Sequence, residues 1–266
     1  MVKAVNIFTP ADVPLYTYVE CADQGLEKRL RDAVEIPKMV ISISGPSKSG
    51  KTALVNKVVL KDNLITVSGA SIGSANDLWR MILDWMDVPT SRTEQKGTKV
   101  VGGVEGKGGG NISLPLVAKG TVEAKTNHGG ERQWETSETY WPDNLTQVIK
   151  EIANSDFVVF IDDFHYIPKD VQQDIGKQIK AAAEREIRIC TASVPHRSDD
   201  VVRSNPELRG RVTAIDVEYW NQKDLEEIAK LGFRELNADI EAAVVQQMAA
   251  EAFGSPQLMQ AICLNM

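Results

Sequence analysis

The 266-residue sequence predicts an α/β fold in which helices cover both faces of a parallel five-stranded sheet. Two observations predict it. Five short apolar segments alternate with segments of helical periodicity, as in strands joined by crossover helices. These apolar segments also lack regular polar alternation, which is typical of strands buried on both faces. The expected strands span residues 38–44, 64–68, 156–161, 187–192 and 212–217.

Composition limits the classes of protein to which the chain can belong. The net charge of −7 argues against a non-specific nucleic-acid coat as the main activity. The three cysteines, Cys21, Cys190 and Cys263, fit neither zinc spacing nor a disulfide framework, which favours a reducing compartment. The sequence shows neither a signal-peptide pattern nor an apolar run near the ~18 residues of a membrane span. We therefore expect a cytoplasmic protein without a membrane partner.

The first predicted strand leads directly into an octapeptide with phosphate-binding chemistry. Its residues are Gly45, Pro46, Ser47, Lys48, Ser49, Gly50, Lys51 and Thr52. This G-x4-G-K-[ST] pattern between a strand and a helix defines a phosphate-binding loop, or P-loop. Its glycines let backbone N–H groups face phosphate oxygens, and the following helix, which includes Ala53, adds donors and a partial positive charge. We expect Lys51 to contact the β- and γ-phosphates and the Thr52 hydroxyl to bind Mg²⁺.

A pair of carboxylates follows the third predicted strand. Ligands bind at the carboxyl edge of an open parallel sheet, which is where Asp162 and Asp163 are expected. We assign Asp162 to Mg²⁺ and Asp163 to the orientation or deprotonation of the attacking water. The alternative is that Asp163 only caps a helix or turn. The sequence lacks the Asn-Lys-x-Asp signature that reads guanine, so ATP is favoured over GTP.

Further candidate site residues lie later in the chain. The fourth strand is expected to lie between the P-loop strand and the Asp162 strand. Thr191 or Ser193 at its end is expected to contact the γ-phosphate or the attacking water, and a simple turn hydroxyl is the alternative. Arg203, Arg209 and Arg211 precede the last strand. One of these arginines is a candidate for stabilising γ-phosphate charge on a neighbouring subunit, although a surface ion pair is the alternative for each.

Residues 90–140 predict an insertion of β-hairpins. Ten of the 19 glycines lie in this region, between Gly97 and Gly130, and apolar residues occupy even-numbered positions across it. Period-two alternation broken by glycine-rich turns is typical of hairpins with one apolar face. A flexible linker is the alternative.

The two ends of the chain are expected to form separate segments. Residues 1–23 carry prolines that disfavour helix, so we expect an extended segment at the nucleotide site. The core is expected at 24–220. Residues 221–266 predict a small helical lid, whose first helix is expected to end at Gly232 and whose last begins after Ser255 and Pro256.

These motifs together resemble the nucleotide-binding module of the AAA+/STAND superfamily of P-loop ATPases. Gly45–Thr52 matches Walker A, and Phe157–Asp163 resembles Walker B, with Asp163 where AAA+ proteins usually have Glu and STAND proteins often have Asp. Thr17-Tyr18-Val19 resembles the segment that packs on adenine, although Glu20-Cys21 departs from the usual arginine-containing pattern. Gly254-Ser255-Pro256 resembles the Gly-x-Pro motif of STAND proteins, whose proline packs on adenine. A plain helix-start proline is the alternative for Pro256.

The resemblance implies an ATPase switch that assembles on ATP and is reset by hydrolysis. It implies ATP/ADP and Mg²⁺ as ligands, a homo-oligomer as the active form, an effector protein or domain as partner, and a role in signalling or defence against phage. The alternatives are an AAA+ regulator that acts on DNA in transposition or replication, and a nucleotide-binding scaffold with negligible turnover. Basic residues of the insertion could face DNA phosphates. They are Arg92, Lys96, Lys99, Lys107, Lys119, Lys125 and Arg132.

Overall fold

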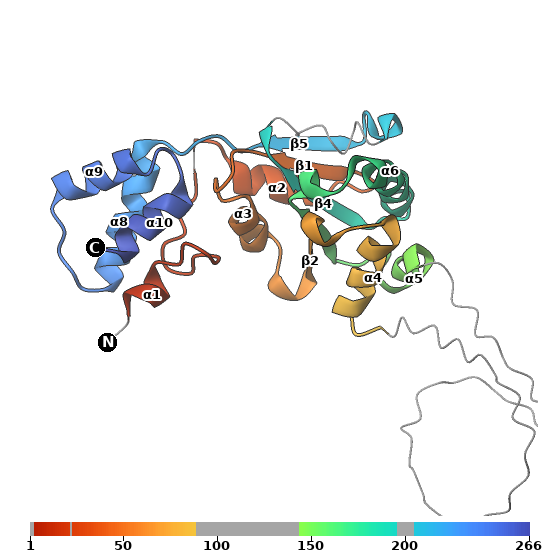
Figure 1. Ribbon diagram of the computed structural model, residues 1–266, viewed down its shortest axis with the longest axis horizontal. Helices are drawn as coiled ribbons and strands as arrows, with labels where there is room; N and C mark the ends of the chain where they lie inside the picture. Colours follow the sequence, from red (N-terminus) through yellow and green to blue (C-terminus); the bar gives the residue numbers. More distant parts are fainter. Residues whose placement is uncertain (1–2, 22, 89–143, 196–204) are drawn as a thin grey trace, which may run out of the picture. The chain divides into compact units, whose positions relative to one another are not determined.

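A parallel five-stranded sheet forms the centre of the protein in a computed structural model that describes residues 3–21, 23–88, 144–195 and 205–266 (Figure 1). The strands are β1 (Val40–Ser44), β2 (Leu64–Ser68), β3 (Val158–Asp162), β4 (Arg188–Ser193) and β5 (Val212–Asp216). Their order is β2-β3-β4-β1-β5, and every neighbouring pair is parallel. The predicted fold class is confirmed, including the strand that lies between the P-loop strand and the Asp162 strand.

Successive residues of each central strand are buried in opposite layers. Val40 packs with one apolar cluster, whereas Ile41 and Ile43 pack with a second cluster on the other face. In β3, Phe160 and Ile161 divide in the same way. Because side chains alternate across a strand, an unbroken apolar run supplies both layers at once.

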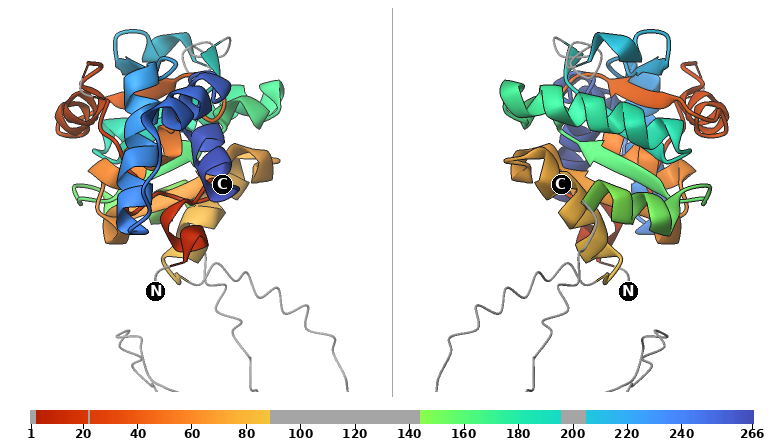
Figure 2. Two further views of the ribbon diagram at one scale, coloured as in Figure 1. Left: turned by 90° about the vertical axis from the view of Figure 1, so that its left-hand side faces the viewer. Right: turned by 90° about the vertical axis from the view of Figure 1, so that its right-hand side faces the viewer.

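Helices cover both faces of the sheet. α2 (Leu26–Val34) and α3 (Lys51–Val58) pack on one face, and α4 (Ala75–Trp85), α5 (Asn144–Ile152) and α6 (Lys169–Glu184) pack on the other. The second group faces the viewer in the right-hand view of Figure 2. Short 3₁₀ helices connect several elements. They are Lys61–Asn63, Gly69–Ser71, Phe164–Tyr166 and Pro206–Leu208.

A third apolar cluster joins the two ends of the described chain. It contains residues of α8 (Gln222–Glu235), α9 (Ala242–Glu251) and α10 (Pro256–Leu264), which we call the C-terminal helices. Ile7 and Phe8, at the end of the short helix α1 (Ala4–Ile7), are buried in the same cluster. The prediction of an N-terminal segment without helix was wrong, since four residues before the first proline form one helical turn.

The predicted end of the first C-terminal helix at Gly232 was also wrong. α8 continues to Glu235 because Gly232 provides space for the ring of Phe8. A Cβ atom at this position would lie 2.1 Å from Phe8 Cε1. The glycine therefore permits close packing inside the helix and does not end it.

The predicted insertion at 90–140 lies outside the described residues, as does Arg203. All described residues belong to one compact unit. Within the described ranges, the structure contains no helix with the length and apolar character that a membrane crossing requires.

Candidate functional site

The P-loop connects β1 to α3. Lys48 and Gly50 have φ angles of +66° and +92°, so the chain turns sharply through left-handed backbone before α3 begins. The Lys51 ammonium donates to the carbonyl oxygens of Gly45 and Pro46, at 2.9 and 2.8 Å. The loop thus places a buried cation beside the N-terminus of α3.

The N-terminus of α3 has unpaired hydrogen-bonding capacity. Its N-cap, Gly50, has no side chain that could accept from the first turn. The first N–H groups of a helix have no intrahelical partner, and they carry a partial positive charge. Together with Lys51, they form a site suited to phosphate.

A hydroxyl–carboxylate pair lies next to this loop. Thr52 Oγ1 donates to Asp162 Oδ2 at 2.6 Å, so α3 and the end of β3 meet there. The other carboxylate oxygen of Asp162 accepts from the backbone N–H of Asp163 at 2.9 Å. Both side chains supply hard oxygen ligands, which Mg²⁺ prefers. The residues that the sequence assigned to Mg²⁺ therefore fit that ion.

Burial disfavours the charged forms of both Lys51 and Asp162. Burial lowers the pKa of Lys51, and the negative charges of Asp162 and Asp163 oppose that effect. Burial likewise raises the pKa of Asp162, and the hydrogen bond from Thr52 opposes it. A bound anion beside Lys51 and a bound cation beside Asp162 would each favour the charged form.

Asp163 is the N-cap residue of the 3₁₀ helix Phe164–Tyr166 and has left-handed backbone, with a φ of +54°. Its side chain makes no capping hydrogen bond to that helix. This weighs against the alternative in which Asp163 serves only as a cap. Asp163 lines the same cavity as Lys51 and Thr52.

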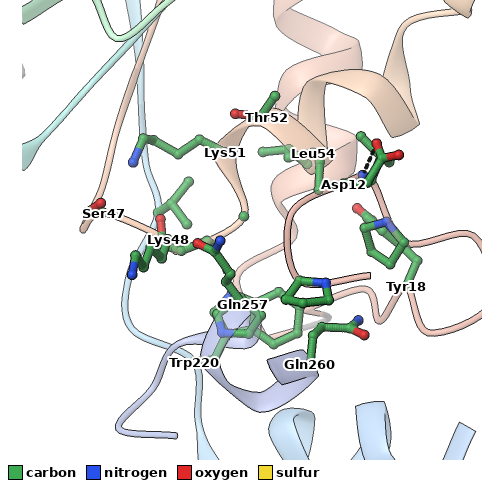
Figure 3. A pocket seen from close by; sticks show the side chains of 18 of the residues that line it. Asp12, Tyr18, Ser47, Lys48, Lys51, Thr52, Leu54, Trp220, Gln257 and Gln260 are labelled. Carbon is green, nitrogen blue, oxygen red and sulfur yellow. Dashed lines mark hydrogen bonds between the residues drawn. The ribbon is translucent and has the colours of Figure 1, made fainter. Parts of the chain in front are cut away.

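A cavity of about 610 Å³ extends from the P-loop to the N-terminal segment and the C-terminal helices (Figure 3). Its volume lies within the usual range for small-molecule and cofactor sites. The predicted site residues that line it are Tyr18, Val19, Ser47, Lys48, Ser49, Gly50, Lys51, Thr52, Ala53, Asp162, Asp163 and Pro256. Gly45 and Pro46 contribute through the carbonyl groups that hold Lys51.

Three buried side-chain atoms without hydrogen-bond partners occur among the described residues, and all three belong to residues that line this cavity. They are Thr9 Oγ1, Ser49 Oγ and His165 Nδ1. Buried polar groups are normally paired, and leaving one unpaired costs roughly 1–3 kcal/mol. The cavity is therefore suited to a polar ligand that reaches several of its walls.

The N-terminal segment forms one wall of the cavity. The Tyr18 ring lies under the ammonium of Lys57, at 5.0 Å from the ring centroid, and the Tyr18 hydroxyl bonds Glu27. Gln260 of α10 donates to Thr17 Oγ1 at 2.6 Å. This wall therefore combines an aromatic ring with buried polar groups.

Residues that lead into the C-terminal helices α8 and α10 contact the P-loop directly. Trp220 Nε1 donates to the Ser49 carbonyl at 3.0 Å, and Ser255 Oγ donates to the Lys48 carbonyl at 3.3 Å. Pro256 lies beside Gly50, at 3.8 Å from the position that a Cβ would occupy. Sequence reasoning missed Trp220 and Gln260, because neither belongs to a local motif.

The predicted position of Thr191 was wrong. β4 continues to Ser193, so Thr191 lies inside the sheet, where its hydroxyl donates to the Ile41 carbonyl at 3.3 Å. Thr191 does not line the cavity. β4 ends one residue past the expected end at Ala192, so Thr191 lies two residues before the edge of the sheet.

Arg209 and Arg211 lie at the amino-terminal edge of the sheet. Arg211 directly precedes β5, and its carbonyl accepts from the Val40 N–H at the start of β1. The P-loop follows the other end of β1, a strand length away, so these arginines do not reach this chain's own P-loop. Arg211 also pairs with Glu184 at 3.2 Å.

Comparisons with known proteins find similarity only at the level of fold. No protein-family model and no curated protein matches the sequence. The RuvB Holliday junction branch migration motor of Thermotoga maritima is 15% identical with a TM-score of 0.52, over 95% of this chain and 63% of RuvB. Cdc6p from Pyrobaculum aerophilum is 14% identical with a TM-score of 0.58, over 96% and 63% of the two chains.

A Walker-type ATPase of Pyrococcus abyssi is also similar, at 16% identity and a TM-score of 0.55, over 89% of this chain and 65% of the ATPase. This chain spans less than two thirds of the length of each of these proteins. Such identities establish a shared architecture and nothing finer. The chain therefore has the fold of the P-loop ATPases of AAA+-like type.

Proposed function

We propose that this chain binds and hydrolyses ATP. The observation that carries the proposal is the convergence of Lys51, the N-terminus of α3 and the Thr52–Asp162 pair on one cavity. These groups supply a cation, backbone donors and hard oxygen ligands, and they line one cavity although Asp162 lies far from the P-loop in sequence. Triphosphate with Mg²⁺ is the ligand that requires all three.

Each side chain has a role in this proposal. Lys51 and the N–H groups of the P-loop hold the β- and γ-phosphates. Thr52 and Asp162 hold Mg²⁺, which would offset phosphate charge when bound. Asp163 orients or deprotonates the attacking water. The Asp163 side chain makes no capping hydrogen bond to the 3₁₀ helix that follows it, which supports this role.

Tyr18, Val19 and Pro256 are proposed to pack around the adenine. All three line the cavity together with the P-loop, and Pro256 is the first residue of α10. In this proposal the chain divides into an N-terminal segment at 1–23, an ATPase core at 24–220 and a helical lid at 221–266. The lid closes over bound nucleotide.

Steady-state hydrolysis tests the catalytic assignment. We expect Asp163→Asn to lower turnover about 100-fold or more, the range typical of a lost general base. Asp156→Asn is the matched control, because Asp156 precedes the opposite end of β3, is exposed and pairs with Arg188 away from the cavity. A wild type as slow as Asp163→Asn would contradict the enzyme assignment and favour the nucleotide-binding scaffold.

Equilibrium binding tests the P-loop assignment. Lys51→Ala is expected to abolish ATP binding, whereas Lys61→Ala, at an exposed site after α3, should bind normally. If the folded Lys51→Ala protein still binds ATP with wild-type affinity, the P-loop assignment is wrong.

We further propose that the chain is a switch of the STAND type that assembles on ATP. The position of Arg209 and Arg211 away from this chain's own P-loop supports a role across a subunit boundary. An effector protein or domain would then respond to assembly, in signalling or defence against phage. Light scattering without nucleotide, with ADP and with a non-hydrolysable ATP analogue should give a larger particle only in the last case.

Mixing two inactive variants tests the trans-acting arginine. Lys51→Ala and Arg209→Ala should each be inactive, but a mixture should regain activity, because an intact P-loop can then meet an intact arginine. Arg211→Ala is compared with Glu184→Gln, which breaks the same ion pair and leaves the arginine in place. No recovery in any mixture would remove the trans-acting role.

An ATPase that acts on DNA is the second candidate. The similarity in fold to RuvB, a branch migration motor, and the basic residues between Arg92 and Arg132 favour it. A DNA mobility shift that requires ATP and weakens steeply with salt would support it. Absence of binding at ~50 mM salt would exclude it, since phosphate contacts are strongest at low salt.

A further inference from the structure

Trp220 connects the C-terminal helices to the P-loop through two hydrogen bonds. Its backbone N–H donates to the Gly254 carbonyl at 3.0 Å, just before α10. Its indole Nε1 donates to the Ser49 carbonyl at 3.0 Å. The side chain is half-buried and lines the cavity, as do Lys48 and Gln257, which Figure 3 labels with it.

The bond to Ser49 fixes the orientation of one peptide group. The Ser49 carbonyl and the Gly50 N–H belong to the same planar trans peptide, so they point in opposite directions. A donor that holds the carbonyl on one side therefore aims the Gly50 N–H to the other side. Gly50 is the N-cap of α3, where N–H groups are available to phosphate.

Two further contacts hold the same part of the loop. Ser255 Oγ donates to the Lys48 carbonyl at 3.3 Å, which restrains the preceding peptide. Pro256 Cγ and Trp220 Cζ2 each lie 3.8 Å from the position of a Cβ on Gly50. Gly50 has a φ of +92°, which glycine adopts without steric cost, and glycine has more backbone freedom than other residues, so contacts from outside the loop help to fix its conformation.

We infer that Trp220 is a positioning residue for phosphate binding: it orients the Ser49–Gly50 peptide so that the P-loop is ready to receive the phosphates. The inference rests on the proposed function, since it requires a nucleotide at the P-loop. Its consequence is a direct coupling between phosphate binding and the C-terminal helices. Movement of these helices away from the loop would release the peptide and weaken the hold on phosphate.

Trp220→Phe tests this role because it keeps an aromatic ring and removes the N–H donor. We expect ADP affinity to fall about tenfold, the effect of losing a hydrogen bond that orients a phosphate donor. Trp85→Phe is the matched control. Trp85 is exposed on α4, packs edge-on against Phe157 and does not line the cavity. Titrations are run below the unfolding midpoint of each protein.

Inorganic tripolyphosphate, which has no base or ribose, provides the second measurement. Its ability to displace ADP should weaken in Trp220→Phe by the same factor as ADP affinity. Failure of the wild type to bind ADP would overturn the proposed function itself. If wild type binds ADP, the inference is overturned by unchanged ADP affinity in Trp220→Phe. Tripolyphosphate competition that is unchanged in the variant, or absent in the wild type, would overturn it equally.

Discussion

Thr52 and Asp162 show how two residues far apart in sequence form one small site. Their hydrogen bond of 2.6 Å joins the first turn of α3 to the end of β3. Each was identified from a local motif, and the parallel topology explains why both motifs reach the same edge. Burial raises the pKa of Asp162, so a bound cation should restore its charge.

Thr52→Val should remove most of the dependence of ATP binding on Mg²⁺. Valine keeps the shape of threonine and lacks the oxygen ligand. In the wild type we expect ATP affinity to fall about tenfold or more when EDTA removes Mg²⁺, and in the variant the affinity should already be low and change little. Isothermal titration with and without EDTA measures both values.

The control for this experiment is Thr66→Val. Thr66 is exposed on β2, where valine suits a strand. It should retain the wild-type response to EDTA. A Thr52→Val protein that still responds fully to Mg²⁺ would show that this hydroxyl is not a ligand.

The contact of Trp220 with the P-loop could not be predicted from the sequence. Walker motifs are visible in sequence because their residues are contiguous and their chemistry is fixed by spacing. Trp220 contacts Ser49 across 171 positions, and no local pattern records that contact. Thr191 is the converse case. The sequence predicted a site hydroxyl there, but the residue lies inside the sheet and bonds the Ile41 carbonyl.

At the scale of elements, buried strands were predicted most accurately. Each observed strand begins and ends within two residues of its expected bounds, because continuous apolar runs are distinctive in a sheet covered on both faces. Helix ends were harder, as Gly232 illustrates. A glycine can end a helix or admit a neighbouring ring, and only the packing of Phe8 decides between them.

Gly232→Ala should destabilise the protein despite the better helix propensity of alanine. Alanine favours a helix over glycine by about 1 kcal/mol. Here its methyl would overlap the Phe8 ring, and overpacking typically costs about 1–3 kcal/mol. We therefore expect a lower midpoint in urea denaturation followed by circular dichroism.

A second substitution makes this test specific. Phe8→Leu alone should also destabilise, but combined with Gly232→Ala it should cost less than the sum of the two, because the smaller side chain makes room for the methyl. Lys230→Ala, on the exposed face of the same helix, controls for general effects of substitution in α8. A Gly232→Ala protein more stable than the wild type would contradict the packing argument.

At the scale of the whole molecule, the three cysteines lie in three different regions of the structure. Cys190 lies in the layer formed by α2, α3 and the sheet, Cys263 lies among the C-terminal helices, and Cys21 lines the cavity. All three are free and buried. Burial raises the pKa of Cys21 to about 12 and that of Cys263 to about 12.

Native thiols should therefore react slowly with iodoacetamide at pH 8. For Cys21 and Cys263 the raised pKa lowers the thiolate fraction below that of a free thiol, and thiolate is the reactive form. Peptide mass spectrometry should show rapid labelling of all three residues only in denaturant. Added ATP should slow labelling of Cys21 in the native protein more than labelling of Cys190, since only Cys21 lines the cavity. Fast labelling of native Cys190 would contradict the buried position.

The contact between Thr9 and Gln260 has a consequence for how the protein acquires its structure. The Thr9 N–H donates to Gln260 Oε1 at 3.2 Å across 251 positions, and Ile7 and Phe8 are buried among helices that are synthesised more than 200 residues later. The N-terminal segment therefore emerges from the ribosome long before its partners exist. Closing so long a loop is slow and entropically costly, which places it late in folding. The nucleotide cavity, which includes residues of both the N-terminal segment and α10, should thus be complete only after translation has passed α10.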